Sequence, residues 1–201
     1  MKMETNIVLE GKYISLEPLE WKHKDVLFEA LKSPEVWNYT WRNVRTIDDL
    51  ERIVTDAVNK KKEKEQIPFV VKDKQTGKVI GTTRIGDIDF GNRNVEIGWT
   101  WLSPSVWKTK VNTECKLLLL QYCFEELQVI RVQFSVSGQN LRSQHALERI
   151  GAVKEGTFRK HRVKESGSIH DNIFYSIIDS EWESVKERVI ALLEKRYGER
   201  R

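Results

Sequence analysis

Two lysines stand directly before an apolar run that has the pattern of a buried helix. The stretch SPSVWKTKVNTECKLLLL spans residues 103–120, and Lys108 and Lys110 precede Asn112 and Thr113, whose residue types often cap helices. A helix N-terminus carries a partial positive charge and unpaired N–H groups, so nearby lysines repel it unless an anion binds there. The spacing therefore predicts an anion site at the start of this helix.

Two carboxylates and a tyrosine are candidates for proton transfer. Glu96 lies in the mostly apolar run NVEIGW, where partial burial would raise the pKa of its carboxyl group toward the range of a useful base. Asp171 is a second candidate base, although it falls at the end of a predicted hairpin. Tyr175 could act as an acid, but its place in an alternating strand favours a role in the core.

The cysteines and histidines give no recognisable motif. The only two cysteines, Cys115 and Cys123, lie eight residues apart on one predicted helix, too far apart to form a disulfide with each other. They lack metal-ligand spacing, so we expect no metal and a reducing, cytoplasmic compartment. Cys115 falls in a first helical turn, where a thiol pKa drops and a covalent intermediate on the sulfur is conceivable, but a small buried thiol is the simpler interpretation. The four histidines, His161 among them, are scattered and form no triad pattern.

The composition describes a globular protein with a well-solvated surface. The chain has 201 residues, 39% hydrophobic and 32% charged, with a net charge of +4. This length fits one domain, and we assign residues 1–201 to it. No apolar run is long enough to span a bilayer, and the start, MKMETNIVLEGKY, lacks the pattern of a signal peptide, so we expect no membrane partner. The run NKKKEKE mixes both charge signs at a helix end, which favours a solvated face over nucleic-acid binding.

The periodicity predicts a mixed α+β order on one central sheet. Helices are expected at 20–32, from 46, at 112–127, at 140–151 and at about 181–198. Asn140 is a predicted N-cap, Gly151 a C-terminal stop, and Ser180 with Glu183 a capping box. Strands are expected at 11–19, 67–73, 78–89, 95–103, 129–137, 152–163 and 168–179.

Four segments, in this order and at these spacings, carry a resemblance to a known family. They are EIGWTWLSP at 96–104, WKTKVNTECK at 107–116, NLRSQHALERIGAVKEG at 140–156 and DNIFYSIIDSEW at 171–182. Together they resemble the GNAT acetyltransferase superfamily, and within it the branch of the ribosomal-protein alanine N-acetyltransferases. The resemblance implies a GNAT-like fold, with a mostly antiparallel sheet of about seven strands and helices on both faces. It also implies direct acetyl transfer from acetyl-CoA to a primary amine.

The resemblance assigns the predicted anion site to the pyrophosphate of acetyl-CoA, which suits a helix N-terminus. The family usually has glycines where this chain has Lys108 and Lys110, so the loop must be built differently or bind more weakly. The implied cofactor-binding residues are Trp101, Leu102, Lys108, Thr109, Lys110, Val111, Asn112, Thr113, Asn140 and Ser143.

The resemblance also suggests catalytic and acceptor residues. Glu96 would be the base, unless an ordered water takes this role, and Ser143 would donate to the leaving sulfur while Asn140 holds the pantetheine arm. Helix capping alone could also explain Asn140 and Ser143. His161 would lie near the acceptor side. The acceptor would contact the loop after the first helix, through Trp37, Tyr39, Trp41 and Arg42.

Three questions stay open at the level of sequence. A non-catalytic acyl-CoA-binding module on the same fold is the alternative to an enzyme, because lysines replace the loop glycines. The acceptor is a small-molecule or peptide amine, with ribosomal-protein N-termini, amino acids, polyamines and aminoglycosides as candidates. The protein is a monomer or a homodimer, since the predicted C-terminal helix carries an apolar stripe through Val185 and Val189.

Overall fold

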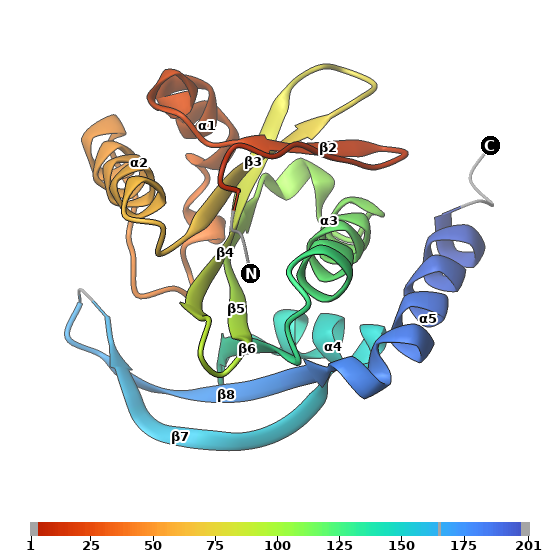
Figure 1. The fold of residues 1–201 in the computed structure, drawn as a ribbon. Helices are drawn as coiled ribbons and strands as arrows, with labels where there is room; N and C mark the ends of the chain where they lie inside the picture. The colour runs from red at the N-terminus through yellow and green to blue at the C-terminus, as the bar shows by residue number, and fades with distance from the viewer. Residues whose placement is uncertain (1–3, 165, 198–201) are drawn as a thin grey trace.

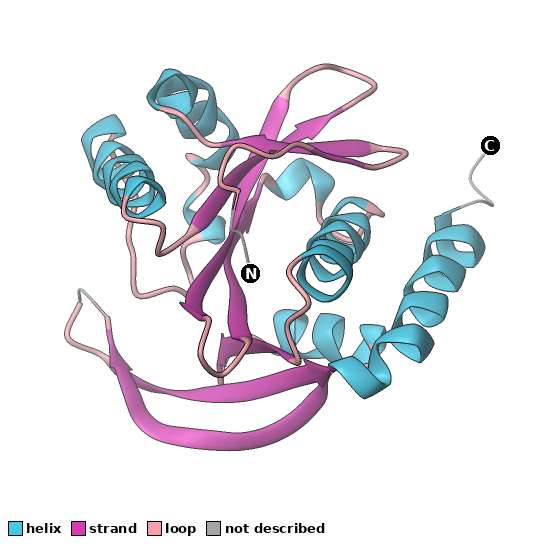
Figure 2. Cartoon of the chain, in the orientation of Figure 1, coloured by secondary structure: helices cyan, strands magenta, loops and turns pink. Residues whose placement is uncertain are grey.

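The computed structural model describes residues 4–164 and 166–197, whose strands form one sheet (Figures 1 and 2). The strand order is β1-β2-β3-β4-β5-β6-β8-β7. Every neighbouring pair is antiparallel except β5 and β6, which run parallel. The strands are β1 Leu9–Glu10, β2 Ile14–Pro18, β3 Ile67–Asp73, β4 Val79–Asp89, β5 Asn94–Leu102, β6 Arg131–Ser137, β7 Val153–Val163 and β8 Ile169–Ile178.

Helices cover both faces of the sheet (Figure 1). Two helices, α1 and α2, pack on one face, and α3 and α5 pack on the other. A π-helical turn, Tyr122–Glu126, extends α3, and short 3-10 turns cover Trp21–His23, Pro34–Val36 and Pro104–Val106. The bounds are α1 Lys24–Leu31, α2 Ile47–Lys62, α3 Val111–Gln121, α4 Leu141–Ile150 and α5 Asp179–Tyr197.

Two apolar clusters hold these layers together, one on each face of the sheet. In β5, Val95 and Ile97 belong to the larger cluster under α3, whereas Trp101 belongs to the cluster under α1 and α2. Strict alternation would place positions 95, 97 and 101 on the same face. The strand must therefore be distorted between Ile97 and Trp101, and this distortion lies at the candidate site.

The predicted α+β fold is confirmed, with eight strands instead of about seven. The additional strand, β1, has only two residues, too few for an alternating pattern to reveal it. Asn140 caps α4, with its side chain accepting a hydrogen bond from the Ser143 N–H, and Gly151 ends the helix at φ 102°. Both predictions are confirmed. Each rests on local backbone chemistry that does not depend on the rest of the fold.

The predicted capping box at Ser180 and Glu183 is wrong. Helix α5 begins at Asp179, and the carboxylate that reaches back is Glu181, which accepts from the Ile178 N–H at 3.1 Å. The predicted end at residue 198 lies outside the described residues, as does Glu165 of the β7–β8 turn. Val185 and Val189 are buried in the molecule's own core, so the apolar stripe of α5 is used within the chain. Among the described residues, no helix is long and apolar enough to cross a membrane.

Candidate active site

The cleft of the molecule begins where the parallel pair β5–β6 separates. The pairing runs from Asn94 with Arg131 to Glu96 with Gln133, and both strands continue beyond it. A cleft of about 290 Å³ follows this split. Its walls come from segments far apart in sequence, mainly 39–41, 97–102, 106–109 and 134–137, together with α3 and α4. The split therefore provides a passage between the two faces of the sheet.

A β-bulge shapes the β5 wall of this cleft. Thr82 of β4 pairs with Trp101 and Arg84 pairs with Gly98, so one residue of β4 faces two residues of β5. Trp99 has a φ of 50°, in the left-handed region that side chains other than glycine seldom adopt. A bulge leaves backbone polar groups outside the sheet ladder. The bulge also explains why Trp101 changes face.

The loop before α3 uses a lysine where a left-handed residue is needed. Lys108 has a φ of 61°, whereas Lys110 has a helical φ of −65°. The Thr109 hydroxyl donates to the Val106 carbonyl at 2.6 Å and accepts from the Val111 N–H at 3.3 Å. Of the two lysines that replace the family's glycines, only Lys108 therefore takes a conformation that favours glycine.

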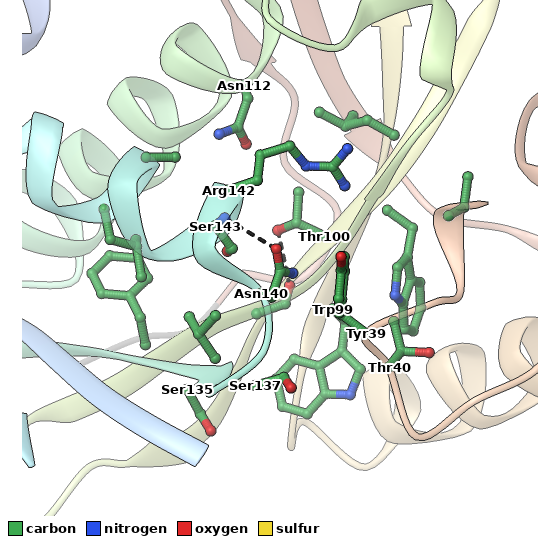
Figure 3. Close-up of a pocket in the computed structure, with 18 of the residues that line it drawn as sticks. Tyr39, Thr40, Trp99, Thr100, Asn112, Ser135, Ser137, Asn140, Arg142 and Ser143 are labelled. Atoms are coloured by element: carbon green, nitrogen blue, oxygen red, sulfur yellow. Dashed lines mark hydrogen bonds between the residues drawn. The ribbon is translucent and has the colours of Figure 1, made fainter. Parts of the chain in front are cut away.

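The start of α3 differs from the prediction in one respect. The N-cap is Lys110, which makes no side-chain capping bond, and Asn112 and Thr113 lie within the first turn. The interpretation of Asn112 and Thr113 as capping residues is therefore wrong, because the helix begins one residue earlier. The Val111 N–H is bonded to the Thr109 hydroxyl, but the backbone N–H groups of Asn112 and Thr113 make no hydrogen bond among the described residues, so they remain available to a ligand. Asn112 lines the cleft, so this helix end opens into it (Figure 3).

The predicted loop residues divide into two groups. Lys108, Thr109 and Asn112 line the cleft with their own atoms. Lys110 does not line it, because its ammonium lies 3.3 Å from the centroid of the Tyr13 ring. Val111 and Thr113 are buried, so they offer a ligand only their backbone.

A buried glutamate fixes the first turn of α3 to the N-terminal hairpin. The Glu114 carboxylate accepts hydrogen bonds from the backbone N–H groups of Lys12, Tyr13 and Ile14 at 2.8–2.9 Å. These bonds satisfy a buried carboxylate, which would otherwise be costly to desolvate. Lys110 on Tyr13 adds a second contact between the same two segments. The β1–β2 hairpin therefore supports the loop at the helix N-terminus.

Helix α4 forms the opposite wall, and it brings two more predicted residues to the cleft. The Asn140 side-chain oxygen accepts from the Ser143 N–H at 3.1 Å, and both residues line the cleft (Figure 3). The cap leaves the Asn140 amide N–H groups and the Ser143 hydroxyl able to contact a ligand. Capping and ligand contact are thus compatible in this geometry. Trp101 and Leu102 line the cleft from β5.

Glu96 lies at the point where β5 and β6 separate. Its carboxylate accepts from the Gln133 side-chain amide at 3.1 Å, and burial raises the pKa of the Glu96 carboxyl group above its usual value. Glu96 itself is not among the lining residues, but Gly98 is, and a Cβ on Gly98 would lie 3.2 Å from Glu96 Oε1. The missing side chain at Gly98 leaves space between the carboxylate and the cleft.

The acceptor loop reaches the cleft through only some of its predicted residues. Tyr39 and Trp41 line it. Trp37 is only 4% exposed, packs 5.1 Å from Trp101 and donates its indole N–H to the Leu31 carbonyl, so it belongs to the core. Arg42 stacks on Trp41 with 5.9 Å between its guanidinium and the ring centroid, and it does not line the cleft.

Two of the alternative residues lie away from the cleft. The Tyr175 hydroxyl is buried, donates to Glu148 at 2.9 Å, and has a pKa raised to about 12 by burial, which confirms its core role. Burial also raises the pKa of the Cys115 thiol to about 11. Cys115 is thus a buried thiol, and the predicted lowering of its pKa is wrong because desolvation outweighs the helix dipole.

The other two alternatives lie on the β7–β8 hairpin. Asp171 is exposed, and its carboxylate accepts from the Lys160 N–H at 2.7 Å. His161 packs edge-on against Phe158 and Phe174. Neither residue is part of the cleft lining.

The sequence analysis missed several cleft residues. Ser137 and His170 lie 3.3 Å apart between Oγ and Nδ1, and Arg162 stacks on Trp41 at 5.2 Å. These pairs join strands or loops distant in sequence, so no local pattern reveals them. Lys116 also lines the cleft. The sequence could have predicted this position of Lys116, because residues 112 and 116 lie on the same face of a helix and Asn112 was already expected at the site.

Comparison with known proteins identifies the family and confirms the fold. The model of the acetyltransferase (GNAT) domain matches residues 14–153. The chain belongs to the GNAT acetyltransferase family. A crystal structure of a GCN5-related N-acetyltransferase from Brucella melitensis shares 32% identity at a TM-score of 0.85, covering 94% of this chain and 86% of that one. The N-acetyltransferase YnaD of Bacillus subtilis, which is uncharacterized, is 25% identical over 85% of this chain and 96% of its own length.

Two further relatives bear on the predicted branch. A candidate ribosomal N-acetyltransferase of Bacillus subtilis, YdaF, is 33% identical over 110 residues, which cover 55% of this chain and 59% of YdaF. The structure of Mycobacterium smegmatis RimJ in complex with CoA-disulfide has the same fold, with a TM-score of 0.76 at 20% identity over 92% of this chain and 90% of that one. The GNAT resemblance is thus confirmed, and the chain is an acetyltransferase. The similarity to YdaF is consistent with the predicted branch, which stays a prediction.

Proposed function

We propose that this GNAT enzyme transfers the acetyl group of acetyl-CoA directly to a primary amine, of a protein N-terminus or of a small molecule, in a ternary complex. The observation that carries the proposal is the N-terminus of α3, where the N-cap residue Lys110 makes no side-chain capping bond and the helix opens into a cleft that continues through the split between β5 and β6. The pyrophosphate of acetyl-CoA is an anion that suits the helix end. Its narrow pantetheine arm, which has apolar and polar groups, suits the split between the strands. The RimJ complex with a CoA derivative supports this interpretation.

The donor would bind along the α3 and α4 walls. Backbone N–H groups of residues 108–113 would hold the pyrophosphate, with the charge of Lys108 and Lys110 adding long-range attraction. Asn140 would hold the pantetheine arm through its amide, and Trp101 and Leu102 would flank it. The N–H groups of Asn112 and Thr113 in the first turn of α3 fit such a ligand, because they need an acceptor.

The chemistry needs a base, a polarised carbonyl group and a donor to the sulfur. Glu96 would take the proton of the acceptor ammonium, either directly or through a water. A backbone N–H of the β5 bulge near Trp99 would polarise the thioester carbonyl. Ser143 would donate a hydrogen bond to the leaving sulfur. Among the described residues, the Ser143 hydroxyl makes no hydrogen bond that this donation would have to replace.

The acceptor would enter from the side of the α1–α2 loop. Tyr39 and Trp41 are the predicted contacts that reach the cleft, and Arg42 on the Trp41 ring could orient a carboxylate at its rim. YdaF is a candidate ribosomal N-acetyltransferase, which favours a peptide N-terminus ahead of a free amino acid, a polyamine or an aminoglycoside. The buried free thiols fit a reducing cytoplasm, and we propose a monomer or homodimer that acts without metal or nucleic acid.

Calorimetric titration of acetyl-CoA at two salt concentrations tests the proposal, followed by a screen of amines for CoA release. We expect micromolar binding that weakens at the higher salt concentration, because an anion contributes to affinity. Binding without turnover on any amine would support the alternative of a non-catalytic acyl-CoA-binding module. If acetyl-CoA does not bind at either salt concentration, the proposal is wrong.

A further inference from the structure

Lys116 is a buried cation that none of the proposed steps uses. It lies one helical turn beyond Asn112 on α3, is only 7% exposed, and lines the cleft. Its Nζ donates to the Thr100 hydroxyl at 3.1 Å and lies 5.7 Å from the centroid of the Phe134 ring. Thr100 is on β5 and Phe134 on β6, so the amine lies beneath the split between the two strands.

The surroundings of Lys116 do not balance its charge. An ammonium has three N–H donors, and the Thr100 hydroxyl accepts only one of them. No carboxylate of the described residues lies within 4.0 Å of Nζ. A buried charge without a partner is costly, so a residue kept in this state suggests a partner that arrives with a ligand.

Burial of Lys116 favours loss of its proton. Desolvation lowers the pKa of the Lys116 ammonium, while Cys115 on α3, Cys123 on the π-helical turn and Glu96 on β5 raise it by smaller amounts. The nearest side chain on β6, Phe134, carries no charge. An ammonium in such a place gives up a proton more readily than one in water.

The leaving thiolate of coenzyme A needs such a proton. A thiol has a pKa of about 8.5, so a thiolate released near neutral pH takes up a proton. Ser143 can donate a hydrogen bond to the sulfur, but an alcohol is a much weaker acid than a thiol and does not give up its proton to a thiolate. Burial makes the Lys116 ammonium a stronger acid than a lysine in water, so it can give a proton to a thiolate.

We propose that Lys116 is the acid that protonates the sulfur of coenzyme A when the acetyl group is transferred. This proposal rests on the proposed function. The acceptor nitrogen, after losing one proton to Glu96, forms a bond with the acetyl carbon and gives its second proton to water in the cleft, and the carbon–sulfur bond breaks. The sulfur keeps that electron pair and takes a proton from Nζ, which leaves Lys116 neutral. Water in the cleft then returns a proton to Nζ.

The test compares the binding of coenzyme A and of desulfo-coenzyme A by calorimetry at pH 6 and pH 8. If a nearby ammonium lowers the pKa of the bound thiol by one unit, the preference for coenzyme A rises about threefold between these pH values, since the thiolate forms in the complex. Desulfo-coenzyme A has no sulfur, so it corrects for titration elsewhere in the protein. The proposal predicts this rise for the natural protein and no rise for Lys116→Met, which keeps the length and apolar character of the side chain.

Three controls make the comparison decisive. Ser143→Ala should keep the rise in preference for coenzyme A between pH 6 and pH 8. If Ser143→Ala loses this rise while Lys116→Met keeps it, the proposal is overturned. Lys74→Met removes an exposed lysine on a distant turn and should also keep the rise. Thermal unfolding establishes that Lys116→Met is folded, as expected, because an unpaired buried charge contributes little to stability.

The outcomes also separate the two proposals. Tight binding of both ligands by the natural protein, without any rise from pH 6 to pH 8, leaves the proposed function intact and refutes the role of Lys116. If neither ligand binds, the proposed function is wrong and the role of Lys116 is wrong with it. If mass spectrometry finds acetyl-Lys116 after incubation with acetyl-CoA, Nζ is a nucleophile, and the role as an acid is also refuted.

Discussion

The left-handed backbone of Lys108 predicts an unusual response to substitution by glycine. At a φ of 61°, a residue with a Cβ costs about 1–2 kcal/mol relative to its preferred conformations, whereas glycine adopts this region freely. Glycine loses more backbone entropy on folding than alanine does, which offsets roughly 0.5–1 kcal/mol of that gain. We therefore expect Lys108→Gly to be more stable than Lys108→Ala by about 1 kcal/mol.

The comparison of glycine with alanine removes the charge of the lysine from the result, since both variants lose it. Urea unfolding followed by circular dichroism would give the difference from the shift in midpoint at constant slope. In a thermal experiment the difference corresponds to roughly 2–4 °C in Tm for a chain of this size. Arg52 is a matched control, because it is an exposed residue within α2.

The control must respond with the opposite sign. In a helix interior, glycine is less stable than alanine by about 1 kcal/mol, so Arg52→Gly should unfold at a lower urea concentration than Arg52→Ala. If Lys108→Ala proves as stable as Lys108→Gly while the Arg52 pair behaves as expected, Lys108 is not held in the left-handed conformation. The structural description of the loop would then be wrong.

Three further predictions concern the site and the acid side of stability. Asn140→Ala should raise the KM for acetyl-CoA and, through loss of the N-cap, lower the free energy of unfolding by about 1 kcal/mol; an unchanged KM would remove Asn140 from the donor site. Because burial raises the pKa of Glu96, activity should rise with pH through that pKa, and Glu96→Gln should lower kcat and remove this rise; equal profiles for both proteins would point to a water. Hydrogen bonds from Arg131 lower the pKa of Glu155 to about 2, so the stability this pair contributes is present above the unfolded pKa of about 4.3 and lost as pH falls toward 2. Urea midpoints between pH 5 and pH 2 should fall less steeply for Glu155→Gln, and an equal slope would refute this.

The sequence predicted the parts of the fold that depend on local chemistry. Asn140 and Gly151 delimit α4 because a side-chain oxygen and a left-handed glycine satisfy helix ends wherever they occur. The start of α3 was misplaced by one residue, because Asn112 and Thr113 also fit a first turn and the actual N-cap, Lys110, uses no side-chain bond.

The arrangement of the candidate site depended on tertiary structure. Trp37 and Trp41 lie in the same short loop, yet one packs on Trp101 and the other faces the cleft. Loop composition cannot separate them, since both are aromatic and their environment comes from β5. Lys116 could have been placed on the same helix face as Asn112 from its spacing, but its contacts with Thr100 of β5 and Phe134 of β6 depend on the tertiary structure.

The contact between Glu114 and the N-terminal hairpin has a consequence for the order in which the protein can assemble. The N–H groups of residues 12–14 are synthesised about a hundred residues before Glu114, whose carboxylate accepts their hydrogen bonds. Closing such a long loop carries an entropic cost that local structure does not pay, so this contact forms late. The loop before α3, residues 103–110, therefore does not reach its final conformation as soon as α3 has been synthesised. This loop becomes ordered only when the N–H groups of residues 12–14 bind the Glu114 carboxylate.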